Sequence, residues 1–456
     1  MKSLIERLRS IVTSGFVRAV AMLVGGAAIA QLIFALSLPV ATRLYSPNDF
    51  SLLALFAAIV WIVSSAACLR FDIAIPIAAR EDEAANLLAL AVGSAVLISA
   101  IVAVPILVAP DWTARQLNRP DSAPFLWLVP IGILFASLYS ATQFWLVRCK
   151  EFREIATTRI AQAAAGAAAQ IGLGLAAVAP FGLVLGQTLN FGAGSIWLAW
   201  RFLRGDPRLL TSVRPSAMRR AFAANSRFPR YSALEALFNS ASIYLPVVLI
   251  SSLAASPEAG FVILAMQVMQ APMSILGSAI AQVYLSRAPN EFRAGTLGRF
   301  TTSIFGGLLR SGVGPLVFAG IVAPEAFAIV FGKEWQPAGA VVTWMTPWFV
   351  TQFLSSPISM ALHVSGNQKI ALVLQMIGLA VRVGAVWITY LIAPGFLTEA
   401  YSLSGFVFYS IYLGVVLHCS GTNRREVIIE LRKSLPTIGL FVAIGLAFTF
   451  VVTALI

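Results

Sequence analysis

The sequence has few charged residues and few side chains of the kinds that build metal or acid–base sites. Charged residues occupy 11% of the 456 positions, against roughly 25% in an ordinary soluble domain. The chain has three cysteines, far apart in sequence, and only two histidines, His363 and His418. It therefore offers no disulfide framework or metal cluster, and it argues against a His-based site.

Signals of enzymatic chemistry are also missing. The sequence has no Gly-rich phosphate loop of the nucleotide-hydrolysing type, no metal-binding His spacing and no paired acids in an outer loop. The longest outer loops that we predict, 110–123 and 324–338, are short for a membrane glycan polymerase or ligase. We therefore expect a protein that is not an enzyme and has no cofactor. Its energy would come from an ion or proton gradient or the membrane potential rather than from ATP.

Long apolar runs dominate what is present. Hydrophobic residues make up 59% of the chain, and runs of about 20 residues, the length that spans a bilayer, recur throughout. We predict an all-α polytopic membrane protein. The run 50–78 exceeds the required length, so it is tilted, bent or protruding. The thirteen predicted spans are 17–40, 50–78, 86–109, 124–147, 157–178, 182–203, 233–253, 259–285, 301–323, 339–362, 370–392, 398–419 and 436–456.

The positions of Lys and Arg predict the orientation, because cytoplasmic loops are enriched in both. With a cytoplasmic N-terminus, 26 of the 32 fall on inner ends and loops, 4 fall outside, and 2, Arg310 and Arg382, lie within spans. We expect a multi-pass protein of the bacterial inner membrane. The net charge of +13 follows this topology, so nucleic acid is not an expected partner.

The chain divides into two predicted lobes of six spans. A basic cytoplasmic linker, 204–232, separates the N-terminal lobe, 1–203, from the C-terminal lobe, 233–419. Residues 420–456 form a cytoplasmic loop and an extra last helix. SPNDF at 46–50 is echoed by SPEAGF at 256–261, both after the first span of a lobe. Ser, Pro and an acid suit a helix start, and the echo supports two related lobes.

Ionisable residues inside spans are the candidate functional groups, because a charge in the bilayer core normally faces a cavity or a partner. Arg310 and Arg382 are deepest, and Gln375 lies on nearly the same helical face as Arg382. Either arginine could pair with an acid, Asp72 or Glu235, or contact a phosphate through its planar guanidinium. Arg70 and Asp72 line an inner vestibule or mark the inner interface. The predicted binding set for pyrophosphate or sugar is Arg310, Arg382, Gln375, Arg70, Asp72 and Glu235.

Neutral side chains within spans allow two readings. Scattered amides, among them Gln143 and Gln170, either link helices by hydrogen bonds or line a sugar-binding cavity. In the fifth span Gly166, Gln170 and Gly174 recur every four residues, which predicts a close-packing seam.

Four segments carry a family resemblance: LYSPNDF at 44–50, LRFDIAI at 69–75, FGKEW at 331–335 and GNQK at 366–369. They resemble bacterial polysaccharide-biosynthesis flippases of the multidrug/oligosaccharidyl-lipid/polysaccharide exporter superfamily. The resemblance implies two six-helix bundles around a central cavity, working by alternating access. It also implies an undecaprenyl-pyrophosphate oligosaccharide as substrate, flipped outward for O-antigen or exopolysaccharide synthesis. Relatives have twelve or fourteen spans, whereas this chain has thirteen predicted ones.

The alternatives are a multidrug or cation antiporter, a lipid II flippase and, from another class, a glycan polymerase or ligase. Multidrug exporters of the same superfamily resemble cation antiporters with an acid in the middle of an N-lobe helix. Here the first span has no acid, and the embedded charges are chiefly arginines. This favours an anionic substrate. The expected partners are the lipid-linked oligosaccharide, the bilayer and the polysaccharide polymerase machinery.

Overall fold

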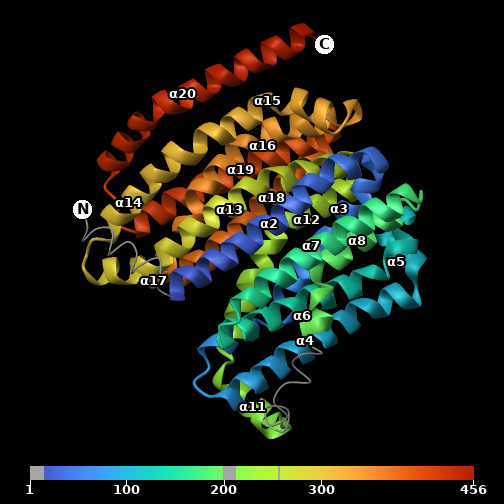
Figure 1. Ribbon diagram of the computed structural model, residues 1–456, viewed down its shortest axis with the longest axis vertical. Helices are drawn as coiled ribbons and strands as arrows, with labels where there is room; N and C mark the ends of the chain where they lie inside the picture. Colours follow the sequence, from blue (N-terminus) through green and yellow to red (C-terminus); the bar gives the residue numbers. More distant parts are fainter. Residues whose placement is uncertain (1–14, 199–211, 255–256, 456) are drawn as a thin grey trace. The chain divides into compact units, whose positions relative to one another are not determined.

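The computed structural model describes residues 15–198, 212–254 and 257–455, and these segments are built from helices (Figure 1). No strand occurs within the described ranges. The predicted all-α class is confirmed. The α-helices of the first half are α2 (Gly15–Leu44), α3 (Pro47–Ala67), α4 (Glu81–Val108), α5 (Pro110–Gln116), α6 (Leu128–Cys149), α7 (Phe152–Leu175), α8 (Phe181–Gly192) and α11 (Pro215–Ala224).

The second half contains longer helices joined by short turns. Its α-helices are α12 (Ala233–Leu253), α13 (Glu258–Arg293), α14 (Leu297–Leu308), α15 (Gly314–Val330), α16 (Gln336–Ser355), α17 (Ala361–Val364), α18 (Gln368–Ile392), α19 (Leu397–Cys419) and α20 (Arg424–Leu455). The π-turns are η3 (Phe228–Ser232) and η4 (Leu309–Val313), and the 3-10 turns are η1 (Asp72–Ile77), η2 (Pro120–Phe125), η5 (Lys333–Trp335), η6 (Ser356–Ile358) and η7 (Pro394–Phe396).

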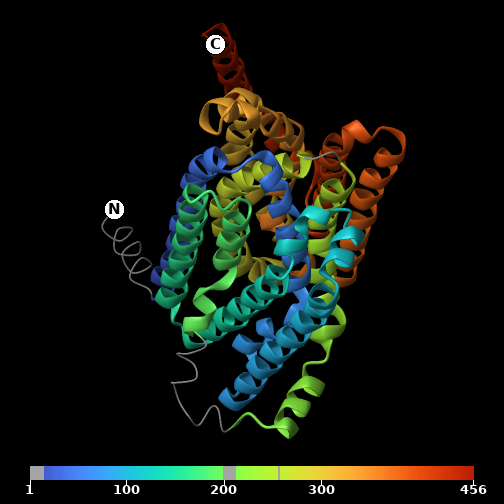
Figure 2. The ribbon, with the colours of Figure 1, turned by 90° about the vertical axis from the view of Figure 1, so that its right-hand side faces the viewer.

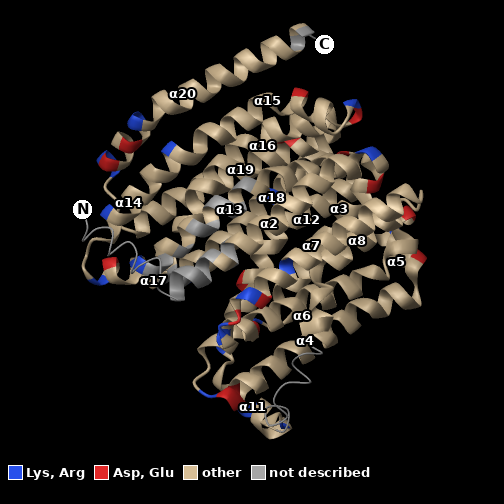
Figure 3. Cartoon of the chain, viewed as in Figure 1, with Lys and Arg blue, Asp and Glu red and all other residues tan. Residues whose placement is uncertain are grey.

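Nine helices of the described chain are long and apolar enough to cross a membrane. Lys, Arg, Asp and Glu lie mostly near helix ends (Figure 3). The protein is therefore a multi-pass membrane protein, as predicted. The other four predicted spans overlap α7, α8, α13 and α16, which are helical but shorter or more polar. The total of thirteen stays a prediction.

The chain forms two compact units. Unit 1 contains residues 1–44 and 56–240, and unit 2 contains residues 45–55 and 241–456. Both α3 and α12 contribute residues to each unit. Of the predicted linker, residues 204–211 lie outside the described part, and the remainder includes α11 and η3. The predicted lobe boundaries stay a prediction.

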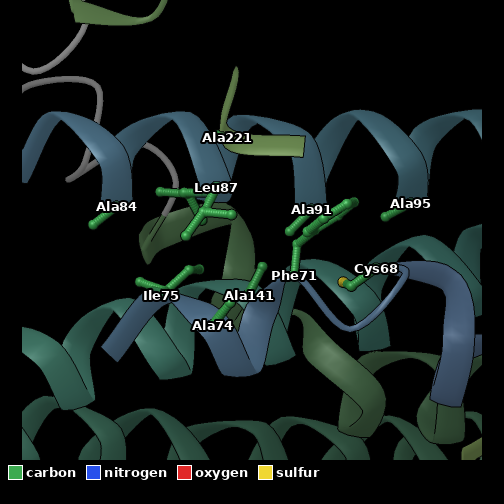
Figure 4. Packing of buried hydrophobic residues seen from close by; sticks show 11 residues of the cluster. Cys68, Phe71, Ala74, Ile75, Ala84, Leu87, Ala91, Ala95, Ala141 and Ala221 are labelled. Carbon is green, nitrogen blue, oxygen red and sulfur yellow. The ribbon is translucent and has the colours of Figure 1, made fainter. Parts of the chain in front are cut away.

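Unit 1 is held together by small residues and a compact apolar cluster. The cluster joins the end of α3, η1, α4, α6 and α11, and its members include Cys68, Phe71, Ile75, Leu87, Ala141 and Ala221 (Figure 4). The seam predicted at Gly166 and Gln170 is confirmed, since both residues abut Gly186 of α8 so closely that it has no room for a Cβ atom. Small side chains let membrane helices approach at such points.

The long second span is broken rather than straight. After α3 ends at Ala67, Leu69 and Arg70 adopt left-handed φ angles of 49° and 59°. Non-glycine residues rarely occupy this region. The chain then continues as η1, so the prediction of a bend is confirmed. Arg148 secures the far end of η1 by donating to the carbonyl oxygens of Ile75 and Ala78, at 3.1 and 2.6 Å.

The two echoed segments pack together in unit 2. Ser46 and Asp49 form the predicted helix cap of α3, with the Ser46 N–H donating to the Asp49 carboxylate at 2.9 Å. Phe50 and Phe261 both meet the buried Trp335 edge-on, with ring centroids 4.8 and 6.1 Å away. Ser256 of the second segment lies outside the described residues.

Within unit 2, α20 is an outlying helix that packs on α14 and α15. Only 6% of its apolar window is buried, and Figures 1 and 2 show its C-terminal end standing away from α15. Gly314 lets Phe441 of α20 approach the backbone of α15. The remaining apolar surface of α20 is exposed, as a lipid-facing helix requires.

Candidate functional site

The predicted binding residues divide between the two units. Arg70, Asp72 and Glu235 belong to unit 1. Arg310, Gln375 and Arg382 belong to unit 2, where Arg310 and Arg382 have different partners. Within unit 2, Arg310 and Arg382 therefore lie in different polar surroundings.

In unit 1, Asp72 is a carboxylate almost removed from solvent. It is 2% exposed, directly after the break in α3. The Ser140 hydroxyl donates to its Oδ2 at 2.6 Å, and the Ile73 N–H donates to its Oδ1 at 3.0 Å. Short hydrogen bonds of this type stabilise a buried anion. The sequence did not point to Ser140, because it lies 68 residues from Asp72.

Arg70 lies two residues before Asp72, and no ion pair joins the two in the described chain. Its Nε is buried without a hydrogen-bond partner among the described residues. A buried cationic N–H group without a hydrogen-bond acceptor destabilises the folded protein. The Nε of Arg70 can therefore bind a further acceptor.

A second arginine lies beside the same stretch of α6. Arg159 of α7 donates from Nε to the Tyr139 hydroxyl at 3.2 Å and from Nη2 to the Gln143 amide oxygen at 3.4 Å. Tyr139 and Gln143 flank Ser140 along α6. In unit 1, Asp72 and Arg159 thus bind polar side chains on the same turn of α6, and Arg70 lies two residues before Asp72. Arg159 was missed as a site residue because its position in sequence suggested an inner-loop cation.

Glu235 lies in the first turn of α12 and is half-buried. The neighbouring Ala236 carbonyl accepts a hydrogen bond from Ser65 of α3 at 3.3 Å. This contact joins α12 to α3 within unit 1. The predicted binding role of Glu235 stays a prediction.

In unit 2, Arg382 is completely buried among aromatic rings. Its guanidinium carbon lies 4.6 Å from the ring centroid of Trp348, 5.0 Å from Tyr409 and 5.1 Å from Phe408. Cation–π attraction of this kind is strongest away from water. No ion pair of Arg382 occurs within the described ranges, and its Nε and Nη2 have no hydrogen-bond partner there.

The hydrogen bond from Arg382 to the backbone of α12 is explained by a proline. Pro246 has no N–H, so the carbonyl of Ser242, four residues earlier in α12, loses its normal helical donor. Arg382 Nη1 donates to this oxygen at 3.2 Å, and the Tyr401 hydroxyl donates to the adjacent Ile243 oxygen at 2.5 Å. Gln375, on the same helix as Arg382, is half-buried with an Oε1 that has no partner among the described residues.

Arg310 is paired with an acid that the sequence did not single out. Its Nη1 lies 3.0 Å from Glu430 Oε2 of α20, and its side chain is 50% exposed. Arg310 belongs to the π-turn η4. The two residues are 120 positions apart in the sequence, so no local pattern could predict that they pair.

No group of three or more His, Cys, Asp or Glu residues able to hold a metal occurs within the described ranges. The arrangement instead offers guanidinium groups with free donors, one buried carboxylate, hydroxyls and amides. Such groups can bind phosphate and sugar oxygens without covalent chemistry.

Solved structures with a similar fold are membrane transport proteins. A structure titled lipid II flippase MurJ, inward closed conformation, has a TM-score of 0.69 and 12% identity, covering 96% of this chain and 98% of its own. The MATE multidrug transporter DinF-BH has a TM-score of 0.59 and 16% identity, covering 91% and 98%. An inward-facing multidrug resistance MATE family transporter of the MOP superfamily has a TM-score of 0.52 and 13% identity, covering 90% and 95%. At these identities the likeness concerns the fold.

Comparison with curated protein sequences finds no match. The sequence does match the family described as polysaccharide biosynthesis protein, over residues 40–340. This match covers more than half of the 456 residues. The chain therefore belongs to the polysaccharide biosynthesis protein family.

Proposed function

We propose that this protein is a flippase for a lipid-linked oligosaccharide. The substrate would be an oligosaccharide on undecaprenyl pyrophosphate, taken from the inner leaflet and released in the outer leaflet by alternating access. The product would supply O-antigen or exopolysaccharide synthesis. One observation carries the proposal: a member of a polysaccharide biosynthesis family has, over nearly its whole length, the fold of a protein titled a flippase.

The unit 1 groups around α6 support an anionic, hydroxyl-rich substrate. Arg70 and Arg159 supply guanidinium groups suited to phosphate oxygens. Ser140 and Gln143 supply neutral donors and acceptors suited to sugar hydroxyls. In this proposal the substrate headgroup contacts this cluster first.

The two arginines of unit 2 are less available to bind the substrate than those of unit 1. Arg310 is already paired with Glu430, so we favour Arg70 and Arg159 over Arg310 for the pyrophosphate. Arg382 is sealed by its aromatic rings, and a contact with substrate would need those rings to move. Its Nε and Nη2 atoms, which have no hydrogen-bond partner among the described residues, keep it as a candidate contact.

Deletion of the gene tests the proposal directly. We expect an undecaprenyl-pyrophosphate oligosaccharide to accumulate on the cytoplasmic leaflet, while the surface polysaccharide is lost. The lipid extract would be analysed by mass spectrometry, and re-expression of the protein is the control. Accumulation of lipid II would instead identify a lipid II flippase. Increased dye sensitivity without a glycan defect would identify a multidrug exporter. Accumulation of unpolymerised glycan in the outer leaflet would identify a polymerase or ligase.

The remaining assignments belong to the same proposal. We place the protein in the bacterial inner membrane with a cytoplasmic N-terminus, because the Lys and Arg distribution supports that orientation. An ion or proton gradient would drive transport, and polysaccharide polymerase machinery would receive the product.

A further inference from the structure

Two charged helix faces meet where α20 begins to cross α14. Along α14 and η4 the face includes Arg299, Ser303 and Arg310, and along α20 it includes Glu426, Glu430 and Lys433. The spacings of three, four and seven residues keep each set on one side of its helix. Figure 3 shows acidic and basic residues together at the start of α20, beside α14. Between the two faces lies a cleft of about 400 Å³.

Part of this charge is already neutralised within the cleft. Glu430 lies between Arg310 Nη1, at 3.0 Å, and Lys433 Nζ, at 2.8 Å. Its carboxylate reaches so close to the backbone of α14 at Gly306 that a Cβ there would collide with it. This side chain is 16% exposed, whereas the side chains of both cations are at least half exposed. Glu430 is therefore the most buried member of this triad.

The triad keeps a net charge of +1, and two further charges of opposite sign line the cleft outside it. Arg299 and Glu426 both line the cleft, and neither makes an ion pair within the part of the chain that the structure describes. The Ser303 hydroxyl beside Arg299 likewise has no hydrogen-bond partner among the described residues. The cleft thus presents an unpaired cation with a hydroxyl, and an unpaired carboxylate on the facing helix.

The cleft adjoins a lipid-facing apolar surface. Ile429 lines it and is 49% exposed. Farther along α20, Leu440, Ile444 and Phe450 are also exposed. A ligand held in the cleft can therefore extend alkyl chains along the helix into the bilayer, and burying them is favourable.

We propose that this cleft binds the headgroup of a zwitterionic phospholipid with a primary ammonium, such as phosphatidylethanolamine. Arg299 and Ser303 bind the phosphate, and Glu426 accepts hydrogen bonds from the ammonium. A purely anionic headgroup would leave the Glu426 carboxylate beside a phosphate. A trimethylammonium headgroup has no N–H to donate to it. This inference is independent of the proposed function, because the bound phospholipid is not the transported molecule.

Lipid binding to the purified full chain tests the proposal. Native mass spectrometry would measure retention of phosphatidylethanolamine, phosphatidylglycerol, phosphatidylcholine and undecaprenyl phosphate, each added alone. We expect phosphatidylethanolamine to be retained best. Arg299→Gln and Glu426→Gln should each weaken its retention about tenfold, the effect of losing one charge-assisted hydrogen bond. Arg432→Gln is the matched control, because Arg432 is exposed on α20 but does not line the cleft. This variant should retain phosphatidylethanolamine as well as the unmodified protein does.

Two results would overturn the proposal. One is equal or tighter retention of phosphatidylglycerol or undecaprenyl phosphate, increased further by Glu426→Gln, because the cleft would then be an anion site. The other is retention of phosphatidylethanolamine that none of the substitutions in the cleft alters. Circular dichroism of each variant would confirm that the helices are intact, so that a loss of binding reports on the cleft itself.

Discussion

At the scale of the residue, Arg382 has two separable properties, a positive charge and a bulky side chain. The side chain fills space between aromatic rings and supplies the donor that Pro246 removes from the Ser242 carbonyl. The charge is costly to bury, yet no ion pair of Arg382 occurs among the described residues. A structural role needs mainly the volume and the donor, whereas a role in transport needs the charge.

Arg382→Met separates these roles, because Met keeps much of the volume and removes the charge. Loss of the donor to Ser242 should lower the free energy of unfolding by about 1–3 kcal/mol. Removal of the buried charge should offset part of this loss. We expect an inserted, abundant protein with a slightly lower melting temperature and no polysaccharide export. Arg382→Lys, the control that retains a cation, should keep part of the export. Full export by the Met variant in a complementation assay would assign Arg382 a purely structural role.

Asp72 allows a similar test in unit 1. Asp72→Asn has almost the same shape. Its Oδ1 can still accept from the Ile73 N–H while its Nδ2 donates to the Ser140 hydroxyl, so the helix break should persist. We expect normal abundance and export reduced by at least about tenfold, as expected if a charged group in a membrane span is functional. The matched control is Asp82→Asn, since Asp82 is an exposed partner of Arg80 in the same unit. Unimpaired export from the Asp72 variant would show that this carboxylate only stabilises the local backbone.

At the scale of the element, close helix packing depends on individual glycines. Gly186→Ala would push a methyl group against Gln170 and the Gly166 carbonyl, and overpacking of this kind costs about 1–3 kcal/mol. We expect a lower melting temperature of the detergent-solubilised protein. Gly172→Ala is the matched control, because the space beside it is open and Ala favours a helix over Gly by about 1 kcal/mol. Equal melting temperatures for the two variants would contradict the seam.

Sequence patterns predicted the positions of the helices better than they predicted the contacts between helices. Apolar runs located the helices, and the cap at Ser46 and the seam at Gly166 followed from local spacing, since both depend on residues within a few turns. The left-handed break at Leu69 and Arg70 has no local signal, because neither residue favours that conformation. The Arg310–Glu430 pair and the Asp72–Ser140 bond were also unpredictable, because each depends on how separate helices pack.

At the scale of the whole molecule, the shared fold leaves substrate choice to particular side chains. The likeness to the lipid II flippase structure covers 96% of this chain at 12% identity, so helix order is retained while most side chains differ. A fold can host several functions, and the site decides among them. In the proposed function, charged groups within the spans, rather than the fold, distinguish an oligosaccharide from a drug or from lipid II.

The number of spans decides on which side of the membrane the chain ends. The cations of α20, Arg424, Arg425, Arg432 and Lys433, lie within its first ten residues, and the rest of the helix is apolar. Because basic residues stay in the cytoplasm, α20 should start inside and end outside. Alkaline phosphatase fused after Leu455 should be active, whereas a fusion after Thr422 should be inactive. An inactive C-terminal fusion in an abundant, exporting protein would mean that α20 does not cross the bilayer or that the span count is even.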